Sequence, residues 1–221
     1  MGERYKGPEP KDAKPASDKE AQPVAAAETG GGWTEYYENT KETPPSELLR
    51  QALSFVHERG VAMDLGAGGL KDTRFLLDEG FETVIAVDGQ PEVRALAETI
   101  QDDRLEVVIE LFAQLRLDPD SLDLVNAQFS LPFSGPDDLE LVLDRIKRAL
   151  KSGGVFNGQL FGDRDQWSEV DRGIAFVTEA SERELFSDME LLSFREIDED
   201  GRLASGHGNR WHYFDIIARK H

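Results

Sequence analysis

The stretch from Val61 to Asp72 constrains the fold more than any other part of the chain. A short apolar run ends in Asp64, the turn Gly66-Ala67-Gly68-Gly69 follows, and the chain then enters an amphipathic segment. This order of strand, glycine-rich loop and helix brings a ligand close to the backbone at the carboxyl edge of a parallel sheet. The stretch therefore predicts an α/β fold with a ligand site at this loop.

A second acid supports the same prediction. The next apolar run, Thr83 to Val87, ends in Asp88, which is followed by Gly89. An acidic side chain at the tip of the strand after a glycine loop suits the two hydroxyls of a ribose. We therefore expect a nucleoside cofactor at this edge, with Asp64, Gly66, Ala67, Gly68, Asp88 and Gly89 among its contacts.

Two kinds of nucleoside cofactor use this architecture. A dinucleotide such as NAD favours the pattern G-x-G-x-x-G, because the third glycine lets helix and strand pack closely. Here Lys71 stands in the third position. S-adenosylmethionine carries a cationic amino group that NAD lacks, and Asp64 at the end of the first strand could reach it. A simpler alternative is that the glycines only serve a tight turn between strand and helix.

Composition places the chain among ordinary globular proteins. It has 221 residues, of which 39% are hydrophobic and 31% charged, enough for one domain with a full core. We expect residues 1–32 to be a disordered tail, because they hold almost no large apolar side chain, and residues 33–221 to form the domain. No apolar run reaches ~20 residues and no segment resembles a signal peptide, which favours a cytoplasmic protein without membrane contact.

The charge balance narrows the possible partners. The chain carries 44 acidic and 25 basic residues, a net charge of −19. Nucleic acid is bound through basic side chains that displace counterions from phosphates, so DNA and RNA are poor candidates and a small molecule is a better one. Acidity that only aids solubility remains an alternative. The absence of cysteine excludes disulfides, thiolate nucleophiles and cysteine-bound zinc, and no residue pattern suggests another metal site.

Hydrophobic periodicity predicts the remaining elements. Strands are expected near Leu105–Ile109, Leu122–Ala127 and Val155–Phe161, and two more near residues 190–197 and 211–218. Helices are expected to begin at Ser46, to run over residues 72–79 and 91–100, and to begin at Asp137 and at the capping box Ser181 to Glu184. Ahead of them the aromatic residues Trp33 and Tyr37 either attach the tail to the core or form a lid over the cofactor, where a ring could meet a sulfonium.

From Trp33 to Lys220 this order of elements resembles a class I S-adenosylmethionine-dependent methyltransferase. The segment from Asp64 to Gly68 is similar to that family's acid-x-Gly-x-Gly motif, although Leu70 replaces the usual third glycine. The resemblance implies a Rossmann-like seven-stranded sheet, mostly parallel with the last strand antiparallel and helices on both faces. A shorter resemblance, which includes Tyr36-Tyr37 and Phe161-Gly162-Asp163, is to bacterial small-molecule methyltransferases related to the tellurite-resistance group.

The resemblance also implies further site residues. An acid after the third strand usually receives the adenine amino group. Here Glu110 is the nearby acid, and Phe112 could pack on the adenine. After the fourth strand, Asn126 and Gln128 are expected to face the ligand or to serve as turn formers. The sequence Asn126 to Phe129 lacks the two prolines that amino methyltransferases of nucleic acid carry here, in agreement with the charge.

Candidate substrate contacts lie nearer the end of the chain. Asp163 and Arg164 follow the fifth strand among aromatic residues, so they either contact the acceptor or form an ion pair that shapes the loop. His207 lies in a glycine-rich loop and could act as a base. His212, in the last strand, is expected to be structural.

Two other functions remain open at this stage. A methyltransferase-like protein that has lost catalysis could serve as a binding or scaffold module, and both Leu70 and the missing adenine acid allow it. An NAD-dependent reductase is the other, but the chain lacks its third glycine and any Tyr-x-x-x-Lys pair near the fifth strand. The acceptor, the catalytic residues and the oligomeric state are not predicted.

Overall fold

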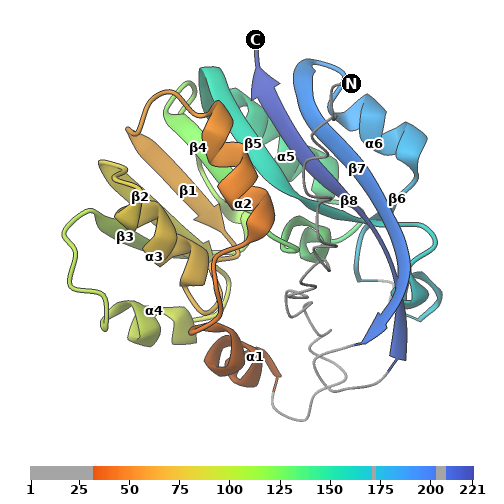
Figure 1. Ribbon diagram of the computed structural model, residues 1–221, viewed down its shortest axis with the longest axis horizontal. Helices are drawn as coiled ribbons and strands as arrows, with labels where there is room; N and C mark the ends of the chain where they lie inside the picture. The colour runs from red at the N-terminus through yellow and green to blue at the C-terminus, as the bar shows by residue number, and fades with distance from the viewer. Residues whose placement is uncertain (1–31, 171–172, 203–207) are drawn as a thin grey trace, which may run out of the picture.

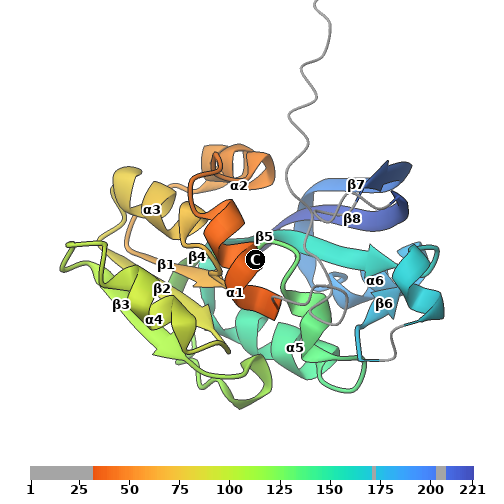
Figure 2. The same cartoon turned by 90° about the horizontal axis from the view of Figure 1, so that it is seen from below.

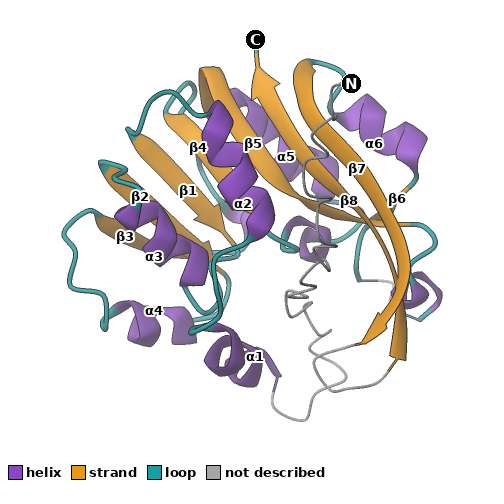
Figure 3. Cartoon of the chain, viewed as in Figure 1, coloured by secondary structure: helices purple, strands orange, loops and turns teal. Residues whose placement is uncertain are grey.

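A mixed sheet with helices on both sides forms the domain in the computed structural model, which describes residues 32–170, 173–202 and 208–221 (Figures 1 and 3). The strand order is β3-β2-β1-β4-β5-β8-β7, with the short β6 paired to β5. β8 runs antiparallel to β5 and β7, while the pairs from β3 to β5 are parallel. The predicted α/β fold with an antiparallel last strand is confirmed.

The strands are β1 (Val61–Leu65), β2 (Thr83–Asp88), β3 (Leu105–Ile109), β4 (Leu122–Ala127), β5 (Leu150–Gly162), β6 (Phe176–Val177), β7 (Met189–Arg202) and β8 (Gly208–Lys220). The α-helices are α1 (Gly32–Thr40), α2 (Glu47–Ala52), α3 (Lys71–Asp78), α4 (Glu92–Ala97), α5 (Leu139–Ala149) and α6 (Glu179–Leu185). Short 3-10 helices are η1 (Leu53–Phe55), η2 (Phe112–Gln114), η3 (Leu131–Ser134) and η4 (Gln166–Glu169).

The core lies on both faces of the sheet because successive side chains of a strand point to opposite faces. Leu124 of β4 packs with Leu49 of α2 and Leu76 of α3 on one face. Its neighbour Val125 packs with Leu143 of α5 on the other. Figure 2 shows α2 and α3 on one side of the strands and α5 on the other. The central strands are therefore enclosed, as their continuous apolar runs predict.

Several predicted boundaries change. β5, β7 and β8 are longer than expected, and α4 is shorter. α5 has Asp138, not Asp137, at its N-cap, and that side chain makes no capping bond. α6 begins earlier than predicted, because Thr178 and Ser181 form the capping box and Ser181 is its third helical residue. The predicted tail, apart from Gly32, and His207 lie outside the described residues.

The candidate site lies where the strand order reverses. The chain runs outward from β1 to β2 and β3, then returns to pair β4 with β1. At such a switch point the loops leave in opposite directions and open a crevice beyond the carboxyl ends of the strands. α1 lies across this edge (Figure 1). The fold therefore brings the loops after β1, β2, β3 and β4 together at the edge of the sheet that α1 covers.

Candidate cofactor site

The glycine loop after β1 needs its glycines for close approach. Gly66 has a positive φ of 81°, and a Cβ there would lie 2.3 Å from the Cβ of Ser130. Gly68 also has a positive φ, and a Cβ on Gly69 would lie 2.8 Å from the carbonyl oxygen of Tyr37. Side chains at these positions would push away the loop after β4 or α1. The glycines therefore do more than form a tight turn.

Leu70, at the position of the third glycine in the motif that the chain resembles, adopts the left-handed conformation. Its φ is 63° and ψ 20°, and its side chain is fully buried with Tyr37, Ala67 and Val93. A left-handed residue costs ~1–2 kcal/mol, whereas burying a leucine stabilises by more. The loop thus turns as a glycine would allow, so Leu70 is no argument for a lost function.

We expect Leu70→Gly to destabilise the protein by up to about 4 kcal/mol. The change relieves the backbone cost, but it leaves a cavity that costs ~2–5 kcal/mol. Urea unfolding measures the difference in free energy. Leu141→Gly, at an exposed position of a helix, is the control for a leucine-to-glycine change outside the core. A Leu70→Gly protein more stable than the wild type would contradict this explanation.

Asp64 is buried at the end of β1 with both carboxylate oxygens bonded. Thr73 Oγ1 donates to Oδ2 at 2.6 Å and Asn126 Nδ2 donates to Oδ1 at 2.8 Å. Burial, followed by repulsion from Asp72, raises the pKa of Asp64 to about 7. Asp64 lines a cavity of about 400 Å³, here called the second cavity, with the glycine loop, Lys71 and Arg50. A cation in that cavity would favour the ionised carboxylate.

A chain of hydrogen-bonded side-chain amides holds the Asp64 carboxylate in place. Asn126 is fully buried; its Oδ1 accepts a 2.7 Å bond from Gln128 Nε2, which also donates to Asn157 Oδ1 at 2.7 Å. Gln128 Oε1 is buried without a hydrogen-bond partner, and Gln128 lines both cavities. Asn126 lines neither cavity, so it orients Asp64, while Gln128 lines both and keeps one buried acceptor oxygen without a partner.

Asp88 holds the other side of the glycine loop. Its Oδ2 accepts a 3.0 Å bond from the Gly68 amide, and its Oδ1 accepts bonds from the Gln90 amide at 2.9 Å and the Tyr37 hydroxyl at 3.0 Å. Burial, and then the Asp88 charge, raise the pKa of Tyr37, so its hydroxyl keeps the proton that it donates. α1 is therefore tied directly to the predicted ribose acid.

We expect Tyr37→Phe to tighten the binding of an adenosyl ligand about two- to tenfold. A carboxylate offers about four acceptor positions, three of which are used on Asp88, so a ribose diol competes with the Tyr37 hydroxyl. Removing a bond made only in the unliganded state, worth ~0.5–1.5 kcal/mol, favours the liganded state. Titration calorimetry with S-adenosylhomocysteine measures the change. Weaker binding would instead show that the hydroxyl stays in place and orients Asp88.

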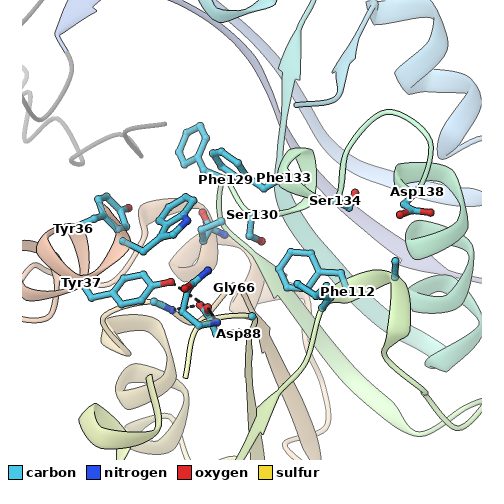
Figure 4. Close-up of a pocket in the computed structure, with 17 residues that line it drawn as sticks. Tyr36, Tyr37, Gly66, Asp88, Phe112, Phe129, Ser130, Phe133, Ser134 and Asp138 are labelled. Carbon is cyan, nitrogen blue, oxygen red and sulfur yellow. Dashed lines mark hydrogen bonds between the residues drawn. The ribbon is translucent and has the colours of Figure 1, made fainter. Parts of the chain in front are cut away.

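Asp88 lines a neighbouring cavity of about 310 Å³, here called the first cavity (Figure 4). The two cavities share Tyr36, Gly66, Gly68, Gln128 and Phe129. Gly89, Phe112 and Trp33 line the first cavity, as do Phe133 and Asp138. Glu110 is not among its lining residues, although its amide bonds to the Asp88 carbonyl. The first cavity is thus an aromatic-walled space that opens directly from the ribose acid.

Trp33 and Tyr37 attach α1 to the domain and also line the first cavity. Trp33 stacks with Tyr37 at 6.2 Å and meets Phe133 edge-on at 5.2 Å. Tyr37 also packs with Leu70 and Ala67 in a buried cluster. The aromatic residues of α1 therefore attach this helix to the domain and, at the same time, form part of the cavity wall.

The predicted substrate loop lies elsewhere. The Arg164 guanidinium pairs with Glu196 and with Asp198 of β7, and neither Asp163 nor Arg164 lines the two cavities. His212 is fully buried; its Nδ1 accepts the Arg164 amide and its Nε2 lies 3.0 Å from Glu196. These contacts match the loop-shaping interpretation of Arg164 and the structural one of His212.

Sequence reasoning missed several lining residues. Phe129, Ser130, Phe133 and Asp138 reach the first cavity from the segment between β4 and α5. Their only sequence signal is that they follow a strand that ends at the predicted site. Among the described residues, no group of three or more histidine, aspartate or glutamate side chains is placed to hold a metal ion. Within the same residues, none of the helices has the length and apolar character needed to cross a bilayer.

Comparison with known proteins relates part of this chain to a known domain. Residues 63–157 match a family profile described as Methyltransferase domain. This segment begins in β1 and ends in β5, so it contains the glycine loop, Asp88 and the loop after β4. No curated protein matches the chain in sequence.

Solved structures share the fold. A methyltransferase in complex with the Trm112 activator from Haloferax volcanii has a TM-score of 0.68 and 22% identity, covering 86% of this chain and 95% of that one. TehB from Haemophilus influenzae has a TM-score of 0.67 and 18% identity, covering 86% and 68%. A Burkholderia thailandensis N1-methyltransferase, with 1,6-didemethyltoxoflavin and S-adenosylhomocysteine bound, has a TM-score of 0.60 and 23% identity, covering 85% of this chain and 85% of that one.

The chain thus has the methyltransferase fold, and its segment from residue 63 to residue 157 is similar to a methyltransferase domain. The domain match and the fold neighbours, one of which holds S-adenosylhomocysteine, indicate S-adenosylmethionine as the cofactor.

Proposed function

We propose that this protein transfers the methyl group of S-adenosylmethionine to a small-molecule acceptor. The observation that carries the proposal is the placement of two carboxylates on the carboxyl ends of adjacent parallel strands. Asp64 pairs in register with Ala86 of β2, and Asp88 follows two residues later. The glycine loop lies between the two acids, and each acid lines one of two cavities that share this loop.

The proposed cofactor spans both cavities. Asp64 receives the amino group of the methionine half, and the cations of Lys71 and Arg50 in the second cavity suit its carboxylate. Asp88 receives the ribose hydroxyls, while Gly89 and Phe112 adjoin the adenine in the first cavity. The sulfonium then lies near the shared residues, which include Tyr36, Gln128 and Phe129. There the ring faces can attract its positive charge.

Positioning supplies most of the proposed catalysis. In an in-line displacement the acceptor atom bonds to the methyl carbon as the bond to sulfur breaks, and the positive charge on sulfur disappears. A water-poor aromatic cavity that holds the acceptor in line with that bond therefore lowers the barrier. A general base is needed only when the acceptor carries a proton in its attacking form.

The first cavity, which also takes the adenosine half of the proposed cofactor, disfavours an anionic acceptor. Among the described residues that line it, the charged ones are Asp88 and Asp138, and no lysine, arginine or histidine joins them. Aromatic rings supply much of the remaining wall. The fold neighbour from Burkholderia thailandensis is an N1-methyltransferase with 1,6-didemethyltoxoflavin bound, which supports a small-molecule acceptor here. The net charge of −19 likewise disfavours nucleic acid.

The proposal is tested first by binding and then by turnover. Titration calorimetry is expected to show S-adenosylhomocysteine binding at micromolar level, and a wild-type protein that binds none at near-millimolar ligand would refute the proposal. A methyl-transfer screen over phenols, aromatic nitrogen heterocycles, amines and metalloid oxyanions then identifies the acceptor class. Binding without any turnover would favour an inactive binding or scaffold module. The oxyanions test the narrower resemblance to the tellurite-resistance group.

A further inference from the structure

The adenine end of the proposed cofactor site lacks the acid that the family usually supplies after the third strand. The residues there are Glu110, Leu111 and Phe112. Leu111 and Phe112 line the first cavity, whereas Glu110 does not. An exocyclic amino group that enters a partly dry cavity without an acceptor loses the hydrogen bonds that it made to water. Another group near Phe112 is needed to receive it.

Asp138 is the second carboxylate that lines the first cavity. It occupies the N-cap of α5, but its side chain makes no capping bond. No other described residue pairs with its carboxylate in a hydrogen bond or an ion pair. The side chain is half-buried. Its carboxylate oxygens therefore do not accept the hydrogen bond from a first-turn amide that an N-cap aspartate normally accepts.

Packing brings Asp138 to the adenine end. η2, which contains Phe112, contacts both η3 and α5. Arg145, in the middle of α5, donates a hydrogen bond to the carbonyl oxygen of Ala113 in η2, which holds α5 against this loop. Figure 4 shows Phe112 between Asp88 and Asp138 along the cavity. A nucleoside with its ribose on Asp88 and its base beside Phe112 directs the far edge of the base toward Asp138.

We propose that Asp138 accepts a hydrogen bond from the 6-amino group of the cofactor's adenine. This inference rests on the proposed function and adds the residue that selects the base. The amino group is a donor, which a carboxylate binds well. Hypoxanthine carries an acceptor oxygen at the same position, and two acceptors cannot bond to each other. Asp138 thereby makes the site specific for adenine.

The test compares S-adenosylhomocysteine with S-inosylhomocysteine, its 6-oxo analogue, by titration calorimetry. We expect the wild type to bind the adenine ligand at least about tenfold more tightly, as sites built to bond a ligand N–H reject analogues without it. Asp138→Asn should bring the two affinities to within about threefold, because an amide can accept from an amino group or donate to an oxo group. Asp137→Asn removes the same charge from an exposed neighbour outside the cavities and should keep the wild-type preference.

The outcomes separate this inference from the proposed function. A wild type that binds neither ligand refutes the proposed function itself. A wild type that binds both ligands equally, or an Asp138→Asn protein that keeps the full preference, overturns only the role of Asp138. Asp138→Ser, which keeps a good N-cap residue, repeats the test if the asparagine variant melts early.

Discussion

Replacing Asp88 by alanine is expected to weaken the binding of S-adenosylhomocysteine roughly 10- to 150-fold, since hydrogen bonds to a charged group are worth ~1.5–3 kcal/mol. The carboxylate has two functions in the site. It is the proposed acceptor for the ribose hydroxyls, and it fixes the loop through the amides of Gly68 and Gln90. Removing it costs ligand contacts and loosens the loop that approaches the cofactor.

Titration calorimetry measures this loss, and two further variants make it specific. Asp88→Asn keeps one acceptor oxygen and the shape of the side chain, so its affinity should lie between those of wild type and alanine variant. Asp103→Ala removes an exposed aspartate outside both cavities and should bind normally. A melting curve confirms that each variant is folded. If a folded Asp88→Ala protein kept the wild-type affinity, the ribose would not bind at Asp88.

Affinity for S-adenosylhomocysteine should rise with pH up to about 7 because Asp64 must be ionised to receive the ligand's ammonium group. Burial and the nearby Asp72 raise the pKa of Asp64 to about 7, so below that pH the free protein holds a proton that binding must displace. Linkage then makes the affinity increase by up to about tenfold per pH unit below the pKa and level off above it. The expected window is about pH 5.5 to 7.5.

Asp64→Asn provides the matched measurement. Asparagine retains an acceptor oxygen for Asn126 and remains within reach of Thr73, so the loop should stay folded. We expect its binding to be weaker than that of the wild type by about tenfold or more at pH 7.5, as is typical of a lost bond between charged groups, and nearly independent of pH across the window. A variant with the wild-type slope would show that the proton leaves another group.

Local patterns were sufficient to predict the ligand-binding edge. The glycine loop, Asp64 and Asp88 are encoded within short segments, because a strand that ends in an acid and a glycine turn has the same local geometry wherever it occurs. Parallel strands then place their carboxyl ends at one edge of the sheet, so the two acids become neighbours. The family resemblance implies the antiparallel last strand, whereas the order of the strands in the sheet comes from the structure.

Local sequence patterns could not predict contacts between side chains that lie far apart in the sequence. The sequence indicates Glu110, the acid nearest to the third strand, yet the cavity that Phe112 lines has Asp138 and not Glu110 in its wall. The sequence leaves Asn126 as a ligand contact or a turn former, but its side chain bonds to the Asp64 carboxylate and lines neither cavity. Arg164 follows a strand end, like the site residues, yet acids on β7 pair with it because β7 lies close by in the folded sheet.

The sequence by itself determined the αβ alternation, the glycine loop and the two acids at neighbouring strand ends, because backbone sterics and hydrophobic periodicity act over a few residues. Only the tertiary structure decided that α1 covers the site, that Tyr37 bonds to Asp88, and that Asp138 reaches the far end of the first cavity. These placements depend on how helices pack across the sheet, and packing joins side chains whose separation along the chain carries no local signal.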